Sequence, residues 1–531
     1  MELIAKTFQG LEAVLATELI ELGANDIQIG NRMVSFTGDK AMMYRANFAL
    51  HTALRILMPI KHFRADNADT VYEEVKAIEW EQYMDIKTTF AVDANIFSTD
   101  FRHSQFVAYR VKDAIVDRWR DITDGEQRPN VRITNPDIRI DIHIAENDVT
   151  ISLDSSGESL HRRGYRQEAV KAPLNEVMAA GIIKLTGWKG DCDFIDPMCG
   201  SGTLPIEAAL IAKNMAPGIF RQDYAFMHWR DFDDDLWQAI YDDDSDEREF
   251  NFHIYAYDIN HNAVQIATSN AKAAGLLDVI TVEQRDIADF TQPEGKAIMV
   301  TNPPYGERLT SDDLLGLYET IGQRLKQAFT GNDAYILSSN QEAFDHIGLK
   351  PSTKTPLLNG SIEVELRKYQ MFAGSYSEMR ASGHHIKTEA EKAANARGMR
   401  KSAAIQDKGR FNRDGDKGRF NRERDDKPRF KRDNDRPRFN REDRDNDRPR
   451  FDRKDRDNDR PRFDRKDRDN DRPRFDRKDR DNDRPRFNRD RNDNDRKPHT
   501  SDRRDSESWE AQRHRKMREM REFLEKNADK D

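Results

Sequence analysis

Residues 302–305, Asn-Pro-Pro-Tyr, carry groups suited to holding a planar amine. Asn302 has a side-chain carbonyl oxygen, and Pro303 and Pro304 lack an N–H, so this turn presents hydrogen-bond acceptors on a rigid backbone. Accepting both hydrogens of an exocyclic amine would direct the nitrogen lone pair at an adjacent electrophile. Tyr305 is suited to stacking on a base taken out of its helix. Such a turn would act through orientation and proximity, although taken alone it also fits an ordinary proline-rich turn.

Upstream, residues 194–210 read FIDPMCGSGTLPIEAAL, which predicts an apolar strand, a glycine turn and a helix. The strand ends in Asp196, the turn is Gly200-Ser201-Gly202, and the helix starts at Thr203. Glycines allow the backbone to approach a ligand closely, and the first N–H groups of a helix have no partner within it. Because α/β folds bind ligands at the carboxyl ends of their strands, this segment predicts a cofactor site.

Two further predicted strands also end in acidic residues. Asp258 closes IYAYD and is suited to bidentate contact with ribose hydroxyls, while Asp286 follows VEQR and is placed to meet an adenine amine. Three acidic strand ends in one α/β domain indicate a nucleotide-like cofactor. A nicotinamide dinucleotide is disfavoured, because Leu204 and Pro205 stand in the region of the third glycine of GxGxxG. The gap between the first two acidic residues also exceeds the roughly 20 residues of that motif.

Neither a metal nor a covalent protein intermediate is required. Cys192 and Cys199 are the only cysteines among 531 residues, and no second Cys/His pair lies at ligand spacing, which argues against disulfides and a zinc site. Cys199 is interpreted as a small packing residue beside the glycine turn. No secretory signal is visible, and no apolar stretch reaches the roughly 20 residues that a bilayer requires. These features predict a cytoplasmic protein.

The motifs need a sheet to position them, and the sequence predicts one within a domain at 161–374. Strand-like and helix-like segments alternate there, as in a doubly wound α/β domain with a mostly parallel sheet. An acidic stretch at 231–249 is expected to be a surface insertion. The expected strands are 193–197, 254–259, 280–286, 297–302, 333–339 and 362–372, and the expected helices are 174–187, 203–215, 261–275 and 312–329.

Two smaller α/β units are predicted before this domain. Residues 1–64 follow the order βαββαβ, which is the ferredoxin-like pattern. Residues 65–160 are expected to form a second unit. Its expected elements are helices at 71–84 and 104–120, an extended segment at 90–97, and two or three strands within 131–153.

The chain changes charge along its length, from a net −19 over residues 1–400 to a net +10 over 401–531. Periodic patterning ends near 375, and an RPRF motif then recurs every 12 residues. One phenylalanine per repeat cannot build a core, so 375–531 is predicted to be a disordered tail. Its interleaved Arg and Phe suit single-stranded RNA, but the Asp residues of each repeat can pair with Arg internally. An RNA-binding tail and an inert solubilising tail therefore both stay open.

Together, DPMCGSGT, YAYDIN, QRDIADF and NPPYGERL resemble the motifs of class I S-adenosylmethionine-dependent methyltransferases that act on planar amino groups. KTFQGLEAVLATEL (6–19), SLHRRGYR (159–166) and APLNEVMAAGIIKLTGW (172–188) are similar to the THUMP-domain RNA methyltransferases. Within that family, the likeness is to the guanine-N2 half of the bacterial large-subunit rRNA enzymes. It covers about residues 1–373.

This resemblance implies a Rossmann-like catalytic domain that binds S-adenosylmethionine, and a THUMP unit (65–160) that grips 23S rRNA. Some relatives carry a second half specific for guanine N7. Here the charged repeat follows instead, so that activity is not expected. The acidic body is unusual for a strong RNA binder. The implied cofactor-binding residues are Asp196, Gly200, Gly202, Asp258 and Asp286, with Ser201, Thr203 and Asn175 as further candidates. The residues implied to hold the guanine amine are Asn302, Pro303, Pro304 and Tyr305.

A basic cluster of His161, Arg162, Arg163 and Arg166 is a candidate RNA contact, because such clusters bind phosphates; its alternative is a solvated linker. The leading hypothesis is methylation of a guanine N2 amine in 23S rRNA. An adenine-N6 methyltransferase on RNA or DNA shares the same chemistry, and a ribosome-assembly factor that mainly binds RNA is a different class. A glutamine-N5 protein methyltransferase would leave the N-terminal units without a use.

Overall fold

The computed structural model describes residues 1–305 and 311–372, which belong to one compact unit. The tail predicted to be disordered, 375–531, lies outside the described residues. Two sheets organise the described part, one in the N-terminal region and one in the catalytic region.

The first part has the predicted ferredoxin-like order βαββαβ, which is confirmed. Apolar residues of helix α1 face the sheet, since Leu15 and Leu19 lie one helical turn apart and are both buried. Asp39 caps α2 by accepting a hydrogen bond from the Met42 N–H at 2.8 Å. The elements are β1 (Glu2–Lys6), α1 (Glu12–Glu21), β2 (Asn25–Ile29), β3 (Met33–Thr37), α2 (Lys40–Ala49) and β4 (Arg55–Arg64).

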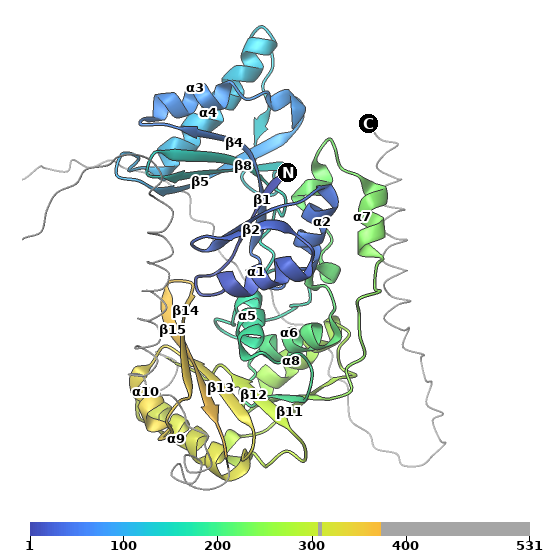
Figure 1. The fold of residues 1–531 in the computed structure, drawn as a ribbon, viewed down its shortest axis with the longest axis vertical. Coiled ribbons are helices and arrows are strands. Elements are labelled where there is room, and N and C mark those ends of the chain that lie inside the picture. The colour runs from blue at the N-terminus through green and yellow to red at the C-terminus, as the bar shows by residue number, and fades with distance from the viewer. Residues whose placement is uncertain (306–310, 373–531) are drawn as a thin grey trace, which may run out of the picture. The chain divides into compact units, whose positions relative to one another are not determined.

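A second α/β part follows, with two helices lying side by side on one face of its strands (Figure 1). The helix expected at 71–84 stops at Lys76, and Trp80 begins a short 3₁₀ turn whose indole N–H donates to the Val75 carbonyl at 2.9 Å. The elements are α3 (Ala68–Lys76), β5 (Thr89–Phe97), α4 (Ser104–Ile122), β6 (Asn130–Val131), β7 (Ile138–Ala145) and β8 (Asp148–Asp154).

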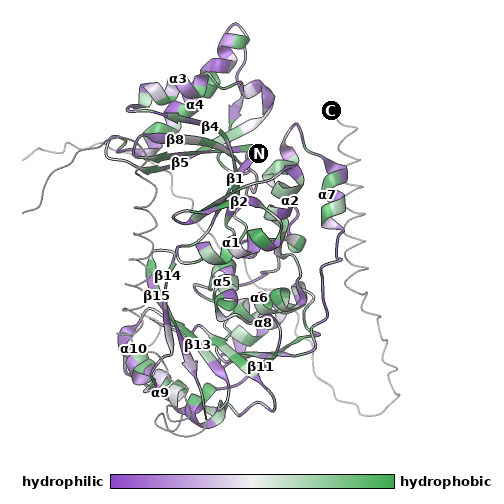
Figure 2. Cartoon of the chain, viewed as in Figure 1, coloured by the Kyte–Doolittle hydropathy of each residue, from purple (hydrophilic) through white to green (hydrophobic). Residues whose placement is uncertain are grey.

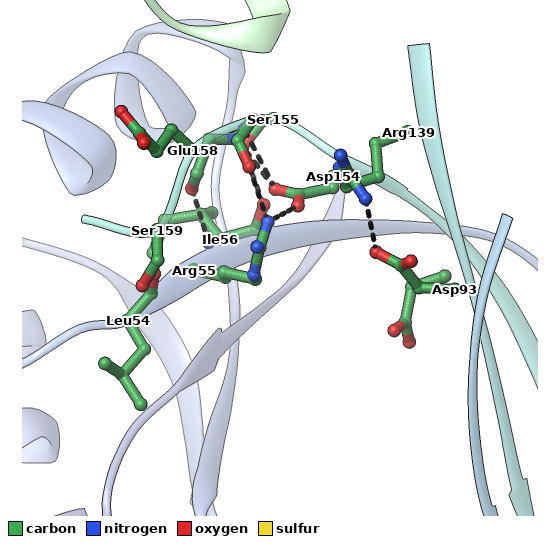
Figure 3. Close-up of polar contacts among 12 residues, drawn as sticks. Leu54, Arg55, Ile56, Asp93, Arg139, Asp154, Ser155, Glu158 and Ser159 are labelled. Carbon is green, nitrogen blue, oxygen red and sulfur yellow. Dashed lines mark hydrogen bonds and ion pairs between the residues drawn. The ribbon is translucent and has the colours of Figure 1, made fainter. Parts of the chain in front are cut away.

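These two parts share one eight-stranded sheet, in the order β2-β3-β1-β4-β8-β7-β5-β6. The join is the antiparallel pairing of β4 with β8, from Leu57 opposite Asp154 to Arg64 opposite Asp148. Figure 3 shows the polar contacts at one end of this join, where the Arg55 guanidinium meets the buried Asp154 carboxylate. The boundary expected at 64/65 therefore separates two parts that share one continuous sheet.

The catalytic part is a seven-stranded sheet in the order β11-β10-β9-β12-β13-β15-β14, which confirms the predicted α/β fold. All neighbouring pairs from β11 to β13 are parallel, and β15 runs antiparallel to both β13 and β14. Helices α5, α6 and α8 lie on one face, and α9 and α10 on the other (Figure 1). The strands are β9 (Asp193–Asp196), β10 (Ile254–Asp258), β11 (Ile280–Gln284), β12 (Ala297–Thr301), β13 (Asp333–Ser338), β14 (Thr353–Asn359) and β15 (Ile362–Gln370).

Three elements of this part were not predicted, namely β14 and the short helices α7 and α10. Strand β14 is an edge strand with Pro356 in its middle, and most of its side chains are at least partly exposed, so it has no clear alternation. The helices are α5 (Glu176–Thr186), α6 (Thr203–Lys213), α7 (Asp234–Tyr241), α8 (His261–Ala273), α9 (Ser311–Ala328) and α10 (Gln341–His346).

The acidic stretch 231–249 is more than the surface insertion expected, because part of it folds and packs. Its helix α7 shows both hydrophilic and hydrophobic residues in Figure 2, and Trp237 and Ile240 are buried. The Trp237 ring centroid lies 5.6 Å from that of Phe48 and 6.2 Å from that of Tyr44, both on α2. The high acidic content conceals an amphipathic helix that joins the catalytic part to the ferredoxin-like part.

Among the described helices, none combines the length and apolar character that a membrane crossing would need.

Replacing Trp237 tests this packing. We expect Trp237→Ala to lower the free energy of unfolding by about 3–5 kcal/mol, because it empties a buried aromatic cluster. Asp235→Ala, an exposed change on the same helix, should have little effect. Urea unfolding of the two variants checks this, and equal stabilities would contradict the packing role of α7.

Candidate active site

The glycine turn lies between the end of β9 and the start of α6, as predicted. Gly200 and Gly202 have φ angles of 55° and 81°, a region that side chains disfavour. A Cβ on Gly202 would lie 3.1 Å from the Cβ of Ala267 on α8, so glycine also lets two helices approach. The turn is thus shaped by backbone conformation and by packing.

Hydrogen bonds tie this turn to the neighbouring strand end. Asp258, the last residue of β10, accepts from the N–H of Gly200 at 2.9 Å and from that of Asn260 at 2.8 Å. Asp286, just beyond β11, accepts from the Ala288 N–H at 2.9 Å. Each carboxylate oxygen keeps a further lone pair for a ligand.

A cavity of about 450 Å³ opens at these strand ends. Of the predicted residues, Gly202, Asn175, Pro303 and Tyr305 do not line it. The structure brings together at its wall Asp196, Gly200, Ser201, Thr203, Asp258, Asp286, Asn302 and Pro304.

Asp196 is buried at the base of this cavity. Its Oδ1 accepts from the Thr301 hydroxyl at 2.8 Å and from the Met198 N–H at 3.2 Å. Burial raises the pKa of Asp196 to about 7, despite those hydrogen bonds, and the nearby charge of Asp258 adds to the rise. Because Thr301 is the last residue of β12, this contact also joins the glycine turn to the Asn-Pro-Pro-Tyr segment.

Asn302 follows β12 and lines the same cavity. Its Oδ1 is buried and has no hydrogen-bond partner among the described residues. Leaving such an acceptor unpaired costs about 1–3 kcal/mol, so this atom is set up to accept from a ligand. Tyr305 Oη accepts from the Asn359 side-chain amide at 3.4 Å, which ties it to the β14–β15 turn, and Pro303 is buried.

The cavity fits an adenosine-containing methyl donor. Asp258 offers acceptors for a ribose diol, and Asp286 one for an adenine amine. Ile259 and Ile287 add apolar surface for an aromatic ring. The described residues contain no cluster of three or more His, Cys, Asp or Glu side chains that could hold a metal ion.

The segment before α5, which the sequence reasoning missed, forms another wall of the cavity. Val170, Ala172, Pro173 and Leu174 line it. The one local signal for this wall is the small and apolar character of most residues from 169 to 174, just before the predicted helix.

Arg166 holds this segment against the glycine turn. Its guanidinium donates to Ser201 Oγ at 2.8 Å and to Thr203 Oγ1 at 2.9 Å, and it forms an ion pair with Glu176 at 2.8 Å. Asn270 of α8 donates to the Ser201 carbonyl at 2.9 Å. The geometry therefore makes Arg166 a positioning residue for the cavity.

The predicted basic cluster does not form one surface. Arg163 is only 2% exposed, forms an ion pair with Glu207 at 3.4 Å and donates to the His51 carbonyl at 2.5 Å. An RNA contact by Arg163 was the wrong expectation, because the segment turns that side chain inward. Arg162 is exposed beside Glu158, and His161 is partly buried beside Ser159.

Two other candidates have structural partners. Asn175 caps α5 through its Oδ1, which accepts from the N–H groups of Val177 at 3.0 Å and Met178 at 3.4 Å. Cys199 is buried beside the turn, and burial raises the pKa of its thiol well above the ordinary range, which fits a packing role.

Strand order, glycine turn and acidic strand ends together define the class I S-adenosylmethionine-dependent methyltransferase fold. Family models match the chain in three consecutive parts: an RlmL ferredoxin-like domain at 2–57, a THUMP domain at 65–154 and an RMKL-like methyltransferase domain at 163–368.

Individual proteins agree with these matches. A Synechocystis protein named "Putative RNA methyltransferase" is 38% identical over 69% of this chain and 96% of its own length. Ribosomal RNA large subunit methyltransferase K/L of Syntrophotalea carbinolica is 39% identical over 68% of this chain and 52% of its own length. The chain thus spans about half the length of the K/L relatives that it matches.

Solved structures agree as well. A protein described as "a putative methyltransferase complexed with SAH" is 30% identical, with a TM-score of 0.63, over 70% of this chain and 99% of that one. A Listeria monocytogenes protein described as a "predicted N6-adenine-specific DNA methylase" is 32% identical, with a TM-score of 0.63, over 70% of this chain and 96% of its own. This chain belongs to the family of THUMP-domain class I methyltransferases, and its cofactor is S-adenosylmethionine.

The role of Arg166 is open to a kinetic test. We expect Arg166→Gln to raise the KM for S-adenosylmethionine about tenfold, roughly the loss of one charge-assisted hydrogen bond, while the KM for RNA stays unchanged. Arg166→Lys keeps a charged donor, so its KM for S-adenosylmethionine should lie between those of the wild type and of Arg166→Gln. Arg162→Gln, four residues earlier and exposed, should leave the cofactor KM unaltered. A rise in the RNA KM alone would return Arg166 to an RNA-contacting role.

The raised pKa of Asp196 predicts how stability depends on pH. The folded chain keeps this proton up to about pH 7, whereas the unfolded chain releases it near 3.8. This group therefore lowers the free energy of unfolding as pH rises between those values. In Asp196→Asn the amide oxygen can keep both acceptor contacts without titrating. Its stability relative to wild type should therefore increase from about pH 4 to pH 7 and then level off. Urea unfolding without cofactor measures this, and a pH-independent difference would contradict it.

Proposed function

We propose that this protein transfers a methyl group from S-adenosylmethionine to the exocyclic N2 amine of a guanine in 23S ribosomal RNA, in the cytoplasm. The observation that carries the proposal is the buried, unpartnered Oδ1 of Asn302 on the wall of the cofactor cavity. An amine that donates to this atom is held close to the site where the cofactor presents its methyl group.

The residues of the site act by position. Asn302 accepts one hydrogen of the amine, and the adjoining proline turn adds rigid backbone acceptors for the other. Thr301 donates a hydrogen bond to Asp196, which fixes the start of this turn. Asn359 donates to the hydroxyl of Tyr305, whose ring would stack on the base. S-adenosylmethionine supplies an electrophilic methyl group. The protein therefore contributes orientation and proximity, in keeping with a site that needs no covalent intermediate.

RNA is the substrate class best supported. The ferredoxin-like and THUMP parts occupy the first 160 residues, and the relative that the chain covers almost fully bears the name RNA methyltransferase. The K/L relatives are named for large-subunit ribosomal RNA. The assignment of the guanine N2 atom as the methyl acceptor rests on the likeness of this chain to the guanine-N2 half of such enzymes.

Adenine-N6 methylation is the second candidate, favoured by the name of the similar Listeria structure. The same Asn-Pro-Pro-Tyr geometry can hold either amine. DNA as substrate would leave the N-terminal parts of the chain without a task.

Nucleoside mass spectrometry of ribosomal RNA separates these functions. In cells that lack the gene, we expect loss of N2-methylguanosine from the large-subunit RNA, restored by the wild-type protein and not by Asn302→Ala. Asn251→Ala, which removes an exposed asparagine amide from the same part of the chain, should restore the modification. Loss of N6-methyladenosine instead would move the target to adenine. Ribosome assembly restored by Asn302→Ala would favour a factor whose main task is binding.

A further inference from the structure

The side chain of Asn270, on helix α8, is fully buried and uses every hydrogen-bonding group that it has. Its Oδ1 accepts from the backbone N–H of Gln167 at 2.8 Å and from that of Glu168 at 3.3 Å. Its Nδ2 donates to the carbonyl oxygens of Glu168 at 3.0 Å and Ser201 at 2.9 Å. A carboxamide has two acceptor lone pairs and two hydrogens, so all four are satisfied. Asn270 therefore joins α8 to two other segments, one before α5 and one in the glycine turn.

The segment before α5 is a wall of the cofactor cavity. Residues 167–174, which we call the cavity strap, run without helix or strand to the start of α5. A Cβ on Gly200 would lie 3.6 Å from Val170 Cγ2, so the strap meets the glycine turn at the cavity. Four residues of the strap line this cavity, namely Val170, Ala172, Pro173 and Leu174. The place of the strap therefore decides how the cavity is closed around its ligand.

The backbone of the strap is held in a disfavoured conformation. Ala172 has a φ angle of 52°, in the left-handed region that side chains avoid. Such a conformation persists only where contacts on both sides hold the chain in place. At the downstream end Leu174 is buried, and at the upstream end Asn270 binds the backbone of Gln167 and Glu168. Because the side chains of Gln167 and Glu168 are exposed, side-chain packing does little to hold that end.

We propose that Asn270 is a positioning residue for the cofactor, which holds the cavity strap against the glycine turn and so slows cofactor release. Asn270 does not line the cavity, so it acts through the strap and through Ser201. Arg166 binds the hydroxyl of Ser201 and Asn270 binds its carbonyl, so the two side chains hold this residue from two directions. The proposal goes beyond the proposed function, because it concerns the cofactor and no RNA.

The test measures how fast the product S-adenosylhomocysteine leaves the full chain. Radiolabelled S-adenosylhomocysteine is bound first, an excess of unlabelled compound is added, and the dissociation rate constant is followed. We expect Asn270→Ala to raise this constant about tenfold, because the hydrogen bonds that close the strap are lost. Only folded complexes carry label, so a smaller folded fraction does not alter the rate constant. The matched control is Ser269→Ala, an exposed change one residue away, which should alter it by less than about twofold.

Two further variants separate hydrogen bonding from packing. Asn270→Asp keeps the size of the side chain but sets an oxygen against the carbonyls of Ser201 and Glu168, so release should be at least as fast as in Asn270→Ala. Asn270→Ser keeps a hydroxyl that can still donate, so its rate constant should lie between those of the wild type and of Asn270→Ala. It also serves as the test variant if the other two do not fold.

Hydrogen–deuterium exchange of the same complexes shows where the chain loosens. In Asn270→Ala we expect faster exchange in the strap, with strands β9 and β10 unchanged. Unchanged release in the folded Asn270 variants would overturn the proposal. So would faster exchange that is equal in the strap and in both strands, since Asn270 would then support the fold as a whole. Because no RNA is present, a wrong target base leaves this test intact.

Discussion

The active site depends on the place of β9 between β10 and β12. Parallel pairing sets Ile195 beside Tyr255 and Met299, so the ends of three strands lie at one edge of the sheet. At that edge the Thr301 hydroxyl donates to Asp196, a buried carboxyl whose neighbour Asp258 holds the glycine turn. The cofactor cavity and the Asn-Pro-Pro-Tyr turn are thus one construction, although Asp196 and Thr301 are 105 residues apart in the chain.

The segment from 163 to 174 connects this construction to the N-terminal parts. At one end, Arg163 is buried between Glu207 of α6 and the His51 carbonyl, which lies just beyond α2 of the ferredoxin-like part. At the other end, Leu174 forms cavity wall, and Arg166 between them binds the glycine turn. A buried ion pair adds little net stability, but breaking one is costly, so Arg163 locks the orientation of the segment. The cavity wall is therefore anchored from both sides.

The distribution of charge indicates how an acidic protein can handle RNA. Repulsion by the acidic body would oppose non-specific binding of RNA. Such repulsion lowers affinity more than selectivity, because phosphate contacts give strength without sequence information. The continuous sheet formed by β4 and β8 joins the two N-terminal parts into one support.

The sequence by itself determined the order of elements, the α/β class and the residues at strand ends, because alternation, glycine turns and acidic termini are local patterns. Asp196, Asp258, Asp286 and Asn302 could be named because each stands at or near the end of a predicted strand. Only the tertiary structure decided that Arg163 turns inward, that Arg166 serves the glycine turn, and that α7 packs on α2. Each of these depends on a partner distant in sequence, for which no local pattern exists. The β4–β8 pairing was hidden for the same reason, since its partners lie 97 residues apart at one end and 84 at the other, from Leu57 opposite Asp154 to Arg64 opposite Asp148. The hydrogen-bonding groups of a strand do not specify which strand will pair with it.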